Sequence, residues 1–267
     1  MKAKQKADRG DMAMSEQYNP KELLICMAAR QMEDNKAAFI GTGIPMLAAS
    51  LAKKIYTPNL VSIFEFGGIG SSLADLPMAV GDSRTYYRAL VAGKISDVME
   101  MGQRGMIEFG FIGGAQIDMY GNINSTCLGP QEKPKVRFPG SGGANDIGSS
   151  CFRTIAIMVH DKKRFIPKVD FITTPGYLSG PGAREEAGLP KNSGPFRVIT
   201  SLGILGFDET SKRMKLLSTN PDITTNMVKE NTGFELLLAD HITQNEPPTK
   251  EELKILREVV DPEGLYR

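Results

Sequence analysis

The chain has 267 residues, of which 41% are hydrophobic and 24% are charged, and these proportions are ordinary for a soluble globular protein. Lys and Arg number 32 and Asp and Glu number 31, so the net charge of +1 gives no electrostatic reason to expect nucleic acid or an anionic membrane as a partner. Three cysteines without a CxxC motif and two distant histidines argue against a disulfide framework, a zinc ribbon and a histidine-rich metal site. We therefore expect no bound metal and a reducing, cytoplasmic location.

Residues 1–20 contain no Ile, Leu, Val or Phe, and their basic and acidic residues are interleaved. Because this segment lacks an apolar core it is not a secretory signal, and we expect a disordered leader. The longest apolar stretch, residues 37–52, is interrupted by two glycines and a proline and is too short to cross a membrane as a helix. Residues 21–267 show neither a linker-like segment nor an internal repeat, so we expect them to form one domain.

Along the first half of the chain, short apolar runs alternate with segments of helical spacing. Apolar residues recur every three or four positions in residues 21–34, which predicts a helix, and the run at 37–40 predicts a buried strand. The turn GTGIP then leads into a second helix, of which Leu47, Leu51 and Ile55 form the inner face. Further elements are expected as strands at 60–64, 106–112, 154–159 and 169–173 and as a helix at 86–104.

The second half of the chain is richer in strand patterns. Residues 174–195 contain many glycines and prolines and are expected to be mostly irregular. Because strands alternate with helices in the first half, we expect a parallel sheet there. The fold class is therefore α/β, with an open, mostly parallel sheet, flanking helices and a β-rich C-terminal elaboration. Its remaining elements are predicted as strands at 197–200, 204–207 and 213–217, with a turn at 208–212, and as helices at 222–231 and 249–260.

The sharpest local feature is a glutamate at the end of a strand. The strand at 60–64 runs directly into Glu65, and Gly67, Gly68 and Gly70 follow. Ligands in open α/β sheets bind at the carboxyl ends of the strands, and glycines let a ligand and backbone amides come close. An isolated glutamate is more often a solvated surface residue, and the glycine-rich context weakens that alternative without removing it.

Two further glycine-rich loops share this setting. Residues 113–116 (GGAQ) follow the strand at 106–112, and residues 140–145 (GSGGAN) precede an expected helix. Successive glycines can present backbone N–H groups to an oxyanion, although tight turns in a crowded sheet are their commoner use. No G-x-G-x-x-G motif opens a helix with an acidic residue about twenty positions later, and no Walker lysine is present, so the sequence does not support a dinucleotide or P-loop site.

The histidines and cysteines are weaker candidates. His160 ends a strand and is expected to be structural rather than a general base, and His241 lies in a polar segment and is expected to be exposed. Cys26 lies on a helix face and is expected in the core. Cys127 and Cys151 flank the glycine-rich block, so either of them could lie near a site, although small buried hydrophobic residues are the simpler interpretation.

Several long motifs carry a resemblance to a known family. In chain order they are GTGIP (41–45), the strand-end Glu65, FIGGAQID-x-YGNINST (111–126), K-x-RFPGSGGAN (135–145) and PG-x-x-SGPGAREEAGLP (175–190). Together they resemble the small (B) subunit of class I CoA-transferases, and within that class the glutaconate CoA-transferase B type. The resemblance covers residues 21–267 and implies the CoA-transferase/NagB-RpiA-like fold.

The resemblance also implies a covalent mechanism. Glu65 falls at the place of the family's nucleophile, which attacks an acyl-CoA, forms an acyl-glutamyl anhydride and then becomes a glutamyl-CoA thioester. Gln116 matches an amide near that glutamate. The loop composition suggests Gly142, Gly143 and Ala144 as backbone donors to the oxyanion, with Gln116 assisting. Removal of one such donor is expected to lower turnover ~10²–10³-fold.

The substrate and the partner follow from the same resemblance. Gly67, Gly68, Gly113, Gly114 and Asn145 are expected to line the site for substrate and CoA. CoA is expected as a substrate, and no tightly bound cofactor is expected. The family builds its site between two kinds of chain, so an A (alpha) subunit is expected as the partner, in an α2β2 or larger hetero-oligomer.

Some features leave the substrate and the reaction open. Phe66 follows the glutamate where family members usually carry a small or polar residue, and a bulky ring there could reshape the acyl pocket. A CoA-ester hydrolase, a ring-cleaving hydrolase or a decarboxylase on the same scaffold is the alternative, and a non-catalytic scaffold chain is disfavoured by the intact Glu65. Candidate anchors for a second substrate carboxylate, equally explained as surface charges or salt bridges, are Arg84, Arg88, Arg137 and Arg184.

Overall fold

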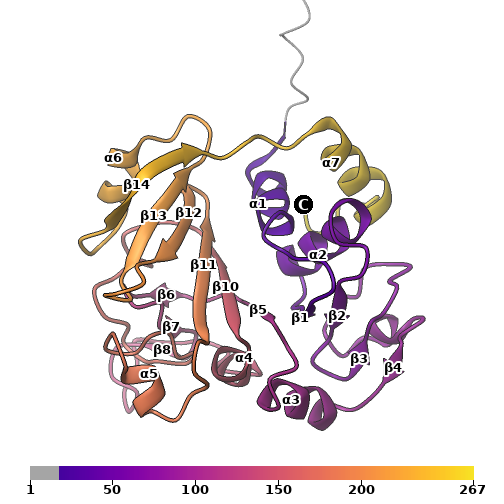
Figure 1. Cartoon of the computed structure of the whole chain (residues 1–267), viewed down its shortest axis with the longest axis horizontal. Coiled ribbons are helices and arrows are strands. Elements are labelled where there is room, and N and C mark those ends of the chain that lie inside the picture. Colours follow the sequence, from indigo (N-terminus) through magenta and orange to yellow (C-terminus); the bar gives the residue numbers. More distant parts are fainter. Residues whose placement is uncertain (1–17) are drawn as a thin grey trace, which may run out of the picture.

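The computed structural model describes residues 18–267 and contains a ten-stranded mixed sheet with helices packed around it (Figure 1). The strand order is β14-β13-β12-β11-β10-β5-β1-β2-β3-β4, and two small hairpins lie beside this sheet. The strands of the main sheet are β1 (Ala37–Phe39), β2 (Val61–Ile63), β3 (Gly68–Ile69), β4 (Val91–Ala92), β5 (Phe109–Ile112), β10 (Arg153–Met158), β11 (Gly194–Thr200), β12 (Gly203–Phe207), β13 (Met214–Thr219) and β14 (Leu237–Gln244). The hairpin strands are β6 (Gln116–Ile117), β7 (Ile123–Asn124), β8 (Cys127–Leu128) and β9 (Val136–Arg137).

Short helices connect and cover these strands. The α-helices are α1 (Pro20–Ala29), α2 (Ile44–Ile55), α3 (Ile95–Gln103), α4 (Ala144–Ser150), α5 (Ala183–Glu186), α6 (Thr225–Glu230) and α7 (Lys250–Ile255). A 3₁₀ turn, η1 (Ser83–Tyr86), precedes β4, and a π-helical turn, η2 (Leu256–Val260), continues α7.

Five neighbouring strands in the middle of the sheet run parallel, in the order β11-β10-β5-β1-β2. Antiparallel strands extend this core on both sides, β12 and β13 next to β11 and β3 and β4 next to β2. Parallel neighbours need crossover connections, which place helices on the faces of the sheet. The predicted α/β class with a β-rich C-terminal part is confirmed.

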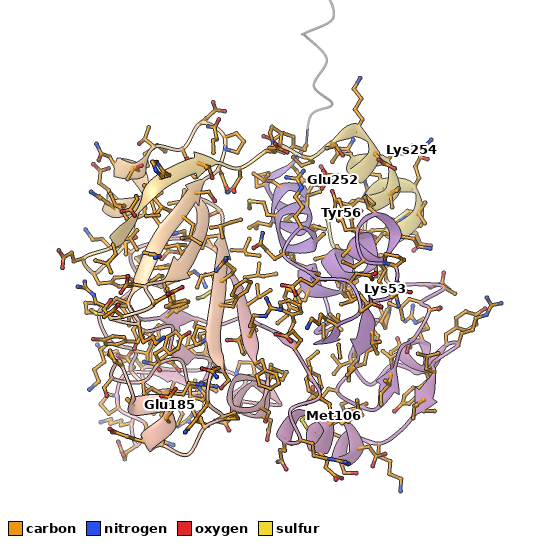
Figure 2. All side chains as sticks on the ribbon, viewed as in Figure 1. Lys53, Tyr56, Met106, Glu185, Glu252 and Lys254 are labelled. Atoms are coloured by element: carbon orange, nitrogen blue, oxygen red, sulfur yellow. The ribbon has the colours of Figure 1, made fainter. Side chains whose placement is uncertain are left out.

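The N-terminal helices form the centre of the larger apolar core. Nearly every residue of α1 is buried, and Asn19 and Glu22 close its first turn as a capping box. Leu47 and Leu51 are fully buried on α2, as their spacing predicts. In Figure 1, the C-terminal α7 returns to lie beside α2, and Figure 2 shows Tyr56 of α2 near Glu252 of α7. The Tyr56 hydroxyl donates to a carboxylate oxygen of Glu252 at 2.7 Å, which ties the chain end to the core.

Most of the predicted elements are present. Residues 174–195 are mostly irregular, as expected, with only α5 and the start of β11 inside them. The helix predicted at 21–34 ends earlier, at Ala29, because the chain then turns through Asn35 with a left-handed φ of 59° before β1. The confirmed strands are β1, β2, β5, β10, β11, β12 and β13, and the confirmed helices are α1, α2, α6 and α7 with η2.

Two predicted features are wrong, and one strand was not predicted. The helix expected at 86–104 begins only at Ile95, because the segment before it forms β4 and the Gly93 N–H donates to the Gly67 carbonyl at 2.9 Å. No strand forms at 169–173, because the Asp170 N–H donates to a side chain instead of a neighbouring strand. The edge strand β14 was not predicted, because its polar, largely exposed residues show no apolar alternation.

The leader expected at 1–20 lies outside the described residues except for its last three, which lead into and begin α1. Among residues 18–267 no helix is both long and apolar enough to cross a lipid bilayer. The His, Cys, Asp and Glu side chains of the same residues form no group that could hold a metal ion.

Candidate active site

Three parallel strands deliver loops to one edge of the sheet. Phe39 of β1 is level with Ile63 of β2 and with Gly110 of β5, so the segments that follow the three strands leave the same edge of the sheet. Neighbouring strands lie about 4.8 Å apart, which keeps the three loops within about 10 Å of one another. The N-terminus of α2 lies at this edge too, so the positive end of its dipole favours negative charge there.

Glu65 occupies a tight turn directly after β2. The Gly67 N–H donates to the Phe64 carbonyl, and the Phe64 N–H donates to the Gly68 carbonyl, both at 2.9 Å. These two bonds hold the backbone on either side of Glu65. The turn therefore fixes where the half-buried Glu65 side chain leaves the sheet.

Gly67 and Gly68 allow close packing against neighbouring main chain and do not lie at an open surface. A side chain at Gly67, whose φ is +116°, would come within 2.3 Å of the Gly93 carbonyl oxygen. A side chain at Gly68 would come within 2.1 Å of the Thr85 carbonyl oxygen. Both glycines are buried. The space that a side chain would need at either position is filled by neighbouring main chain, and the expectation that Gly67 and Gly68 line the ligand site stays a prediction.

The Glu65 carboxylate lies against the glycine-rich loop that precedes α4. A Cβ atom at Gly143 would stand 2.8 Å from Glu65 Oε1 and 3.1 Å from the Met99 methyl carbon, so only glycine permits this approach. The carboxylate makes no hydrogen bond or ion pair with any residue between 18 and 267. The structure thus brings together two predicted site features, Glu65 and the GSGGAN loop, and leaves the carboxylate free to react.

Some backbone N–H groups of this loop already donate a hydrogen bond within the chain, and others do not. Those of Gly142 and Gly143 donate to no acceptor within the described part of the chain. The Ala144 N–H donates to the Ser141 carbonyl at 2.9 Å, so the expected set of three oxyanion donors is corrected to two. Two successive free amides next to a carboxylate form a compact anion-binding nest.

Gln116 is held in a polar network of its own. Its Oε1 accepts from Asn124 Nδ2 at 2.6 Å and from the Asp170 N–H at 3.1 Å, and its Nε2 donates to Asp170 Oδ2 at 3.1 Å. The side chain is buried, and among residues 18–267 its hydrogen bonds go to Asn124 and Asp170 and not to Glu65. In this arrangement Gln116 joins the β6–β7 hairpin to the segment around residue 170. Asp170 was missed by sequence reasoning, which placed it in a strand.

The other expected binding residues divide into packed and open positions. Gly114 is packed, because a Cβ there would lie 2.2 Å from a methyl carbon of Ile123. Gly113 is exposed, with only one carbonyl oxygen at 3.9 Å from such a Cβ. Asn145 is also exposed, and its side-chain amide donates to the Thr173 carbonyl at 3.2 Å. Gly113 and Asn145 therefore remain accessible to a ligand.

The Phe66 ring packs against the loop that precedes η1. The ring is 48% exposed and packs against Gly81, where a Cβ would lie 3.3 Å from ring carbons. The Tyr86 hydroxyl donates to the Phe66 carbonyl. The bulky residue after the nucleophile candidate is thus accommodated by the loop before η1.

Arg184 is not a carboxylate anchor. Its side chain is 1% exposed, and its guanidinium donates to the carbonyls of Gly148, Pro175 and Gly176 and to the Ser193 hydroxyl. Burial lowers the pKa of this guanidinium, so the four acceptors must compensate its desolvation. Arg184 therefore fixes α4, the helix behind the Gly142–Gly143 amides, to the segment at 175–193.

The three other arginine candidates lie nearer the surface. Arg84 forms an ion pair with Asp82, with a 2.6 Å contact, and Arg137 donates to the Gln131 carbonyl. Arg88 lies over the ring of the neighbouring Tyr87. Nothing in these contacts ranks the three as substrate anchors.

The histidines and cysteines take no part in the site. His160 is buried between Thr200 and Thr232, stacks on Phe165 at 3.8 Å and has its pKa lowered by burial to about 4. His241 is exposed on β14, as expected. All three cysteines are buried, and burial raises the pKa of Cys26 and of Cys151 to about 12, which suppresses the reactive thiolate.

Comparison with known proteins decides the family. Residues 21–231 match the family model described as Coenzyme A transferase. The chain belongs to this family. The B subunit of the glutaconate CoA-transferase of Acidaminococcus fermentans is 40% identical over 259 residues, which cover 94% of this chain and 96% of that protein. The B subunit of the 3-oxoadipate CoA-transferase of Pseudomonas knackmussii is 36% identical over 241 residues, which cover 90% and 92%.

Solved structures agree with this assignment. The crystal structure of the Acidaminococcus fermentans glutaconate CoA-transferase matches with a TM-score of 0.89 and 39% identity, covering 93% of this chain and 97% of that one. A more distant relative, the cholesterol ring-cleaving hydrolase IpdB subunit of Rhodococcus jostii, is 30% identical over 223 residues, 83% of each chain. The resemblance found in the sequence is confirmed, and the chain is a CoA-transferase chain of the B type. Because both CoA-transferase relatives are named as B subunits, a companion A subunit is implied.

Two of the predicted site features of this CoA-transferase chain lie together in the structure. A carboxylate with no internal partner among residues 18–267 stands beside the loop that carries two free backbone N–H groups and precedes α4. Sequence reasoning missed Met99, which touches the same space from α3 and had no recognisable motif. It also missed the support that Arg184 gives to α4, which is visible only from the fold.

Proposed function

We propose that the chain is the B subunit of an enzyme that moves CoA between an acyl-CoA and a carboxylic acid, with Glu65 as the covalent nucleophile. The observation that carries the proposal is the Glu65 carboxylate, which has no partner within the described residues and contacts Gly143. A carboxylate is an effective nucleophile toward a thioester when it is held in line with the reacting carbonyl. The hydrogen-bonded turn after β2 supplies that positioning.

The proposed steps balance without any further reactant. A Glu65 oxygen attacks the thioester carbonyl, and the C–S bond breaks to give an acyl-glutamyl anhydride and the CoA thiolate. The thiolate attacks the glutamyl carbonyl, releases the donor acid as a carboxylate and leaves a glutamyl-CoA thioester. The acceptor carboxylate then displaces the thiolate from this thioester, and the thiolate attacks the acceptor acyl carbonyl. The new acyl-CoA leaves, and Glu65 returns to its starting state.

Each of these steps passes through a tetrahedral oxyanion. The free N–H groups of Gly142 and Gly143 belong to the loop that lies against Glu65, and α4 begins directly after them. Donors that are fixed before the reaction stabilise the developing charge without reorganisation. Gln116 is assigned a positioning role, because both of its polar atoms already have partners.

The partner and the substrates follow from the relatives. We propose an A-type chain as the partner, in an α2β2 or larger assembly, with CoA entering as a substrate rather than as a bound cofactor. The acids named for the two CoA-transferase relatives, glutaconate and 3-oxoadipate, are both dicarboxylic. A dicarboxylic or related acyl group is accordingly the proposed substrate class.

Kinetics of the co-purified A-type and B-type chains test the proposal. Glu65→Ala is expected to lower kcat roughly 10⁴-fold or more, as loss of a covalent nucleophile does. Glu185→Gln, which neutralises an exposed glutamate on α5 (Figure 2), is the matched control and should keep full activity. Ping-pong kinetics with both acids should accompany the wild-type activity.

Three outcomes would contradict the proposal. Full transfer activity in the Glu65→Ala complex would remove Glu65 from the mechanism. Release of free CoA at the full rate in the absence of an acceptor acid would indicate a CoA-ester hydrolase instead of a transferase, and release of CO2 with the thioester left intact would indicate a decarboxylase.

A further inference from the structure

A cavity with both polar and apolar lining residues lies on the α2 side of the sheet, and neither Glu65 nor Gly143 lines it. It has a volume of about 170 Å³ and is bounded by α2, by the ends of β1 and β2 and by the segment that follows β3. Ser62 and Phe64 face it from β2, whereas Ile63 points to the other side, toward α3. The polar residues of its lining are Ser50, Lys53, Lys54, Ser62, Ser71 and Ser72, and no carboxylate of the described residues lines it.

The cavity is positively charged and lacks a counter-charge. Lys53 is half-buried on α2 (Figure 2), and neither Lys53 nor Lys54 forms an ion pair or a hydrogen bond within residues 18–267. Burial, with a smaller contribution from Lys54, lowers the pKa of Lys53. A half-buried ammonium group without a partner loses part of its hydration, and a bound anion would offset that loss.

An unpartnered hydroxyl in the cavity wall gives independent evidence. The Ser62 side chain is only 6% exposed, and its hydroxyl has no hydrogen-bond partner in the described structure. Because Ser62 lines the cavity, its hydroxyl is available to whatever fills the space. The Ser62 oxygen is not fully enclosed by the protein, so it is open to a ligand or water in the cavity.

We propose that this cavity binds a phosphate group, with Lys53 and Ser62 as its principal contacts. The ammonium and hydroxyl donors come from α2, β2 and the segment after β3, and donors from several directions suit a tetrahedral anion better than a flat carboxylate. At about 30 Å³ per water molecule, a volume of 170 Å³ corresponds to about six waters, which is room for a phosphate group but not for a nucleotide.

Two sources share this chemistry: inorganic phosphate and a phosphate group carried by CoA. The site is separate from Glu65, and its existence does not depend on the proposed transfer mechanism. Binding of inorganic phosphate without any acyl donor therefore tests the cavity alone. A Glu65→Ala complex should bind phosphate as the wild type does.

Calorimetric titration of the co-purified A-type and B-type chains with inorganic phosphate, against chloride at equal ionic strength, is the experiment. Lys53→Met is expected to weaken phosphate binding at least ten-fold, and Ser62→Ala at least three-fold. Lys254→Met removes an equivalent charge from an exposed position on α7 (Figure 2) and should leave the affinity unchanged. Thermal melting in chloride shows whether each variant remains folded.

The site is refuted if the wild type binds phosphate no better than chloride, or if Lys53→Met and Ser62→Ala bind phosphate with wild-type affinity. Competition between phosphate and CoA distinguishes the two sources. If CoA displaces phosphate but CoA lacking its 3′-phosphate does not, the cavity holds the substrate's 3′-phosphate. If neither form displaces phosphate, the ligand is the free ion.

Discussion

Replacement of Gly143 by alanine should disturb the reacting carboxylate while the fold stays intact. The backbone φ of Gly143 is −81°, which alanine adopts without strain. The new methyl group would stand 2.8 Å from Glu65 Oε1, so the carboxylate must retreat by about 0.5 Å to reach an ordinary contact. Since a displacement of about 1 Å in a reacting group can cost about 100-fold in rate, we expect kcat to fall about 10-fold.

The assay is steady-state CoA transfer by the co-purified chains, with thermal melting as the check on folding. Ala144→Gly is the matched control, because it weakens the start of α4 by about 1 kcal/mol and adds no atom near Glu65. The control should lose stability and keep its kcat. A Gly143→Ala enzyme with a kcat within two-fold of the wild type would refute the inferred role of the contact.

Two further predictions concern the supports of the site. Arg184→Met should lower the free energy of unfolding, measured by urea titration, by about 3 kcal/mol, because the carbonyls of Gly148, Pro175 and Gly176 lose their donor. A decrease of less than about 1 kcal/mol would contradict this role of Arg184. His160 has a folded-state pKa of about 4, below the usual value of about 6.5, so the unfolded chain binds the proton first as the pH falls. The contribution of His160 to the free energy of unfolding should be full above about pH 6.5 and should fall by about 3 kcal/mol by pH 4. In His160→Gln, the free energy of unfolding should change less steeply with pH over this range. An equal slope in both proteins would exclude His160 as the cause.

The alternation of strands and helices in the first half of the chain could be predicted from the sequence. Alternating apolar runs and helical spacing indicated the parallel core, because burial on both faces requires such runs. The start of the helix predicted at 86–104 was misplaced, since the local pattern is helical but residues 91–92 pair with β3. β14 was missed because a solvated edge strand needs no apolar face.

The parts of the candidate site that are formed by residues close together in the sequence could be predicted. Glu65 at a strand end and the glycine-rich loop before a helix are local features, and the fold brings them into contact. The roles of Gly67 and Gly68 were not predictable, because the main chain that fills their space belongs to residues far along the sequence. The buried position of Arg184 likewise depends on acceptors from several distant segments.

The central claim is that Glu65 becomes covalently acylated and then carries CoA. The most direct test incubates the co-purified A-type and B-type chains with an acyl-CoA, traps activated carboxyl groups with hydroxylamine and maps the modified peptide by mass spectrometry. A hydroxamate on Glu65, absent when acyl-CoA is omitted, is the predicted result. An unmodified Glu65 in an enzyme that still transfers CoA at the full rate would contradict the account.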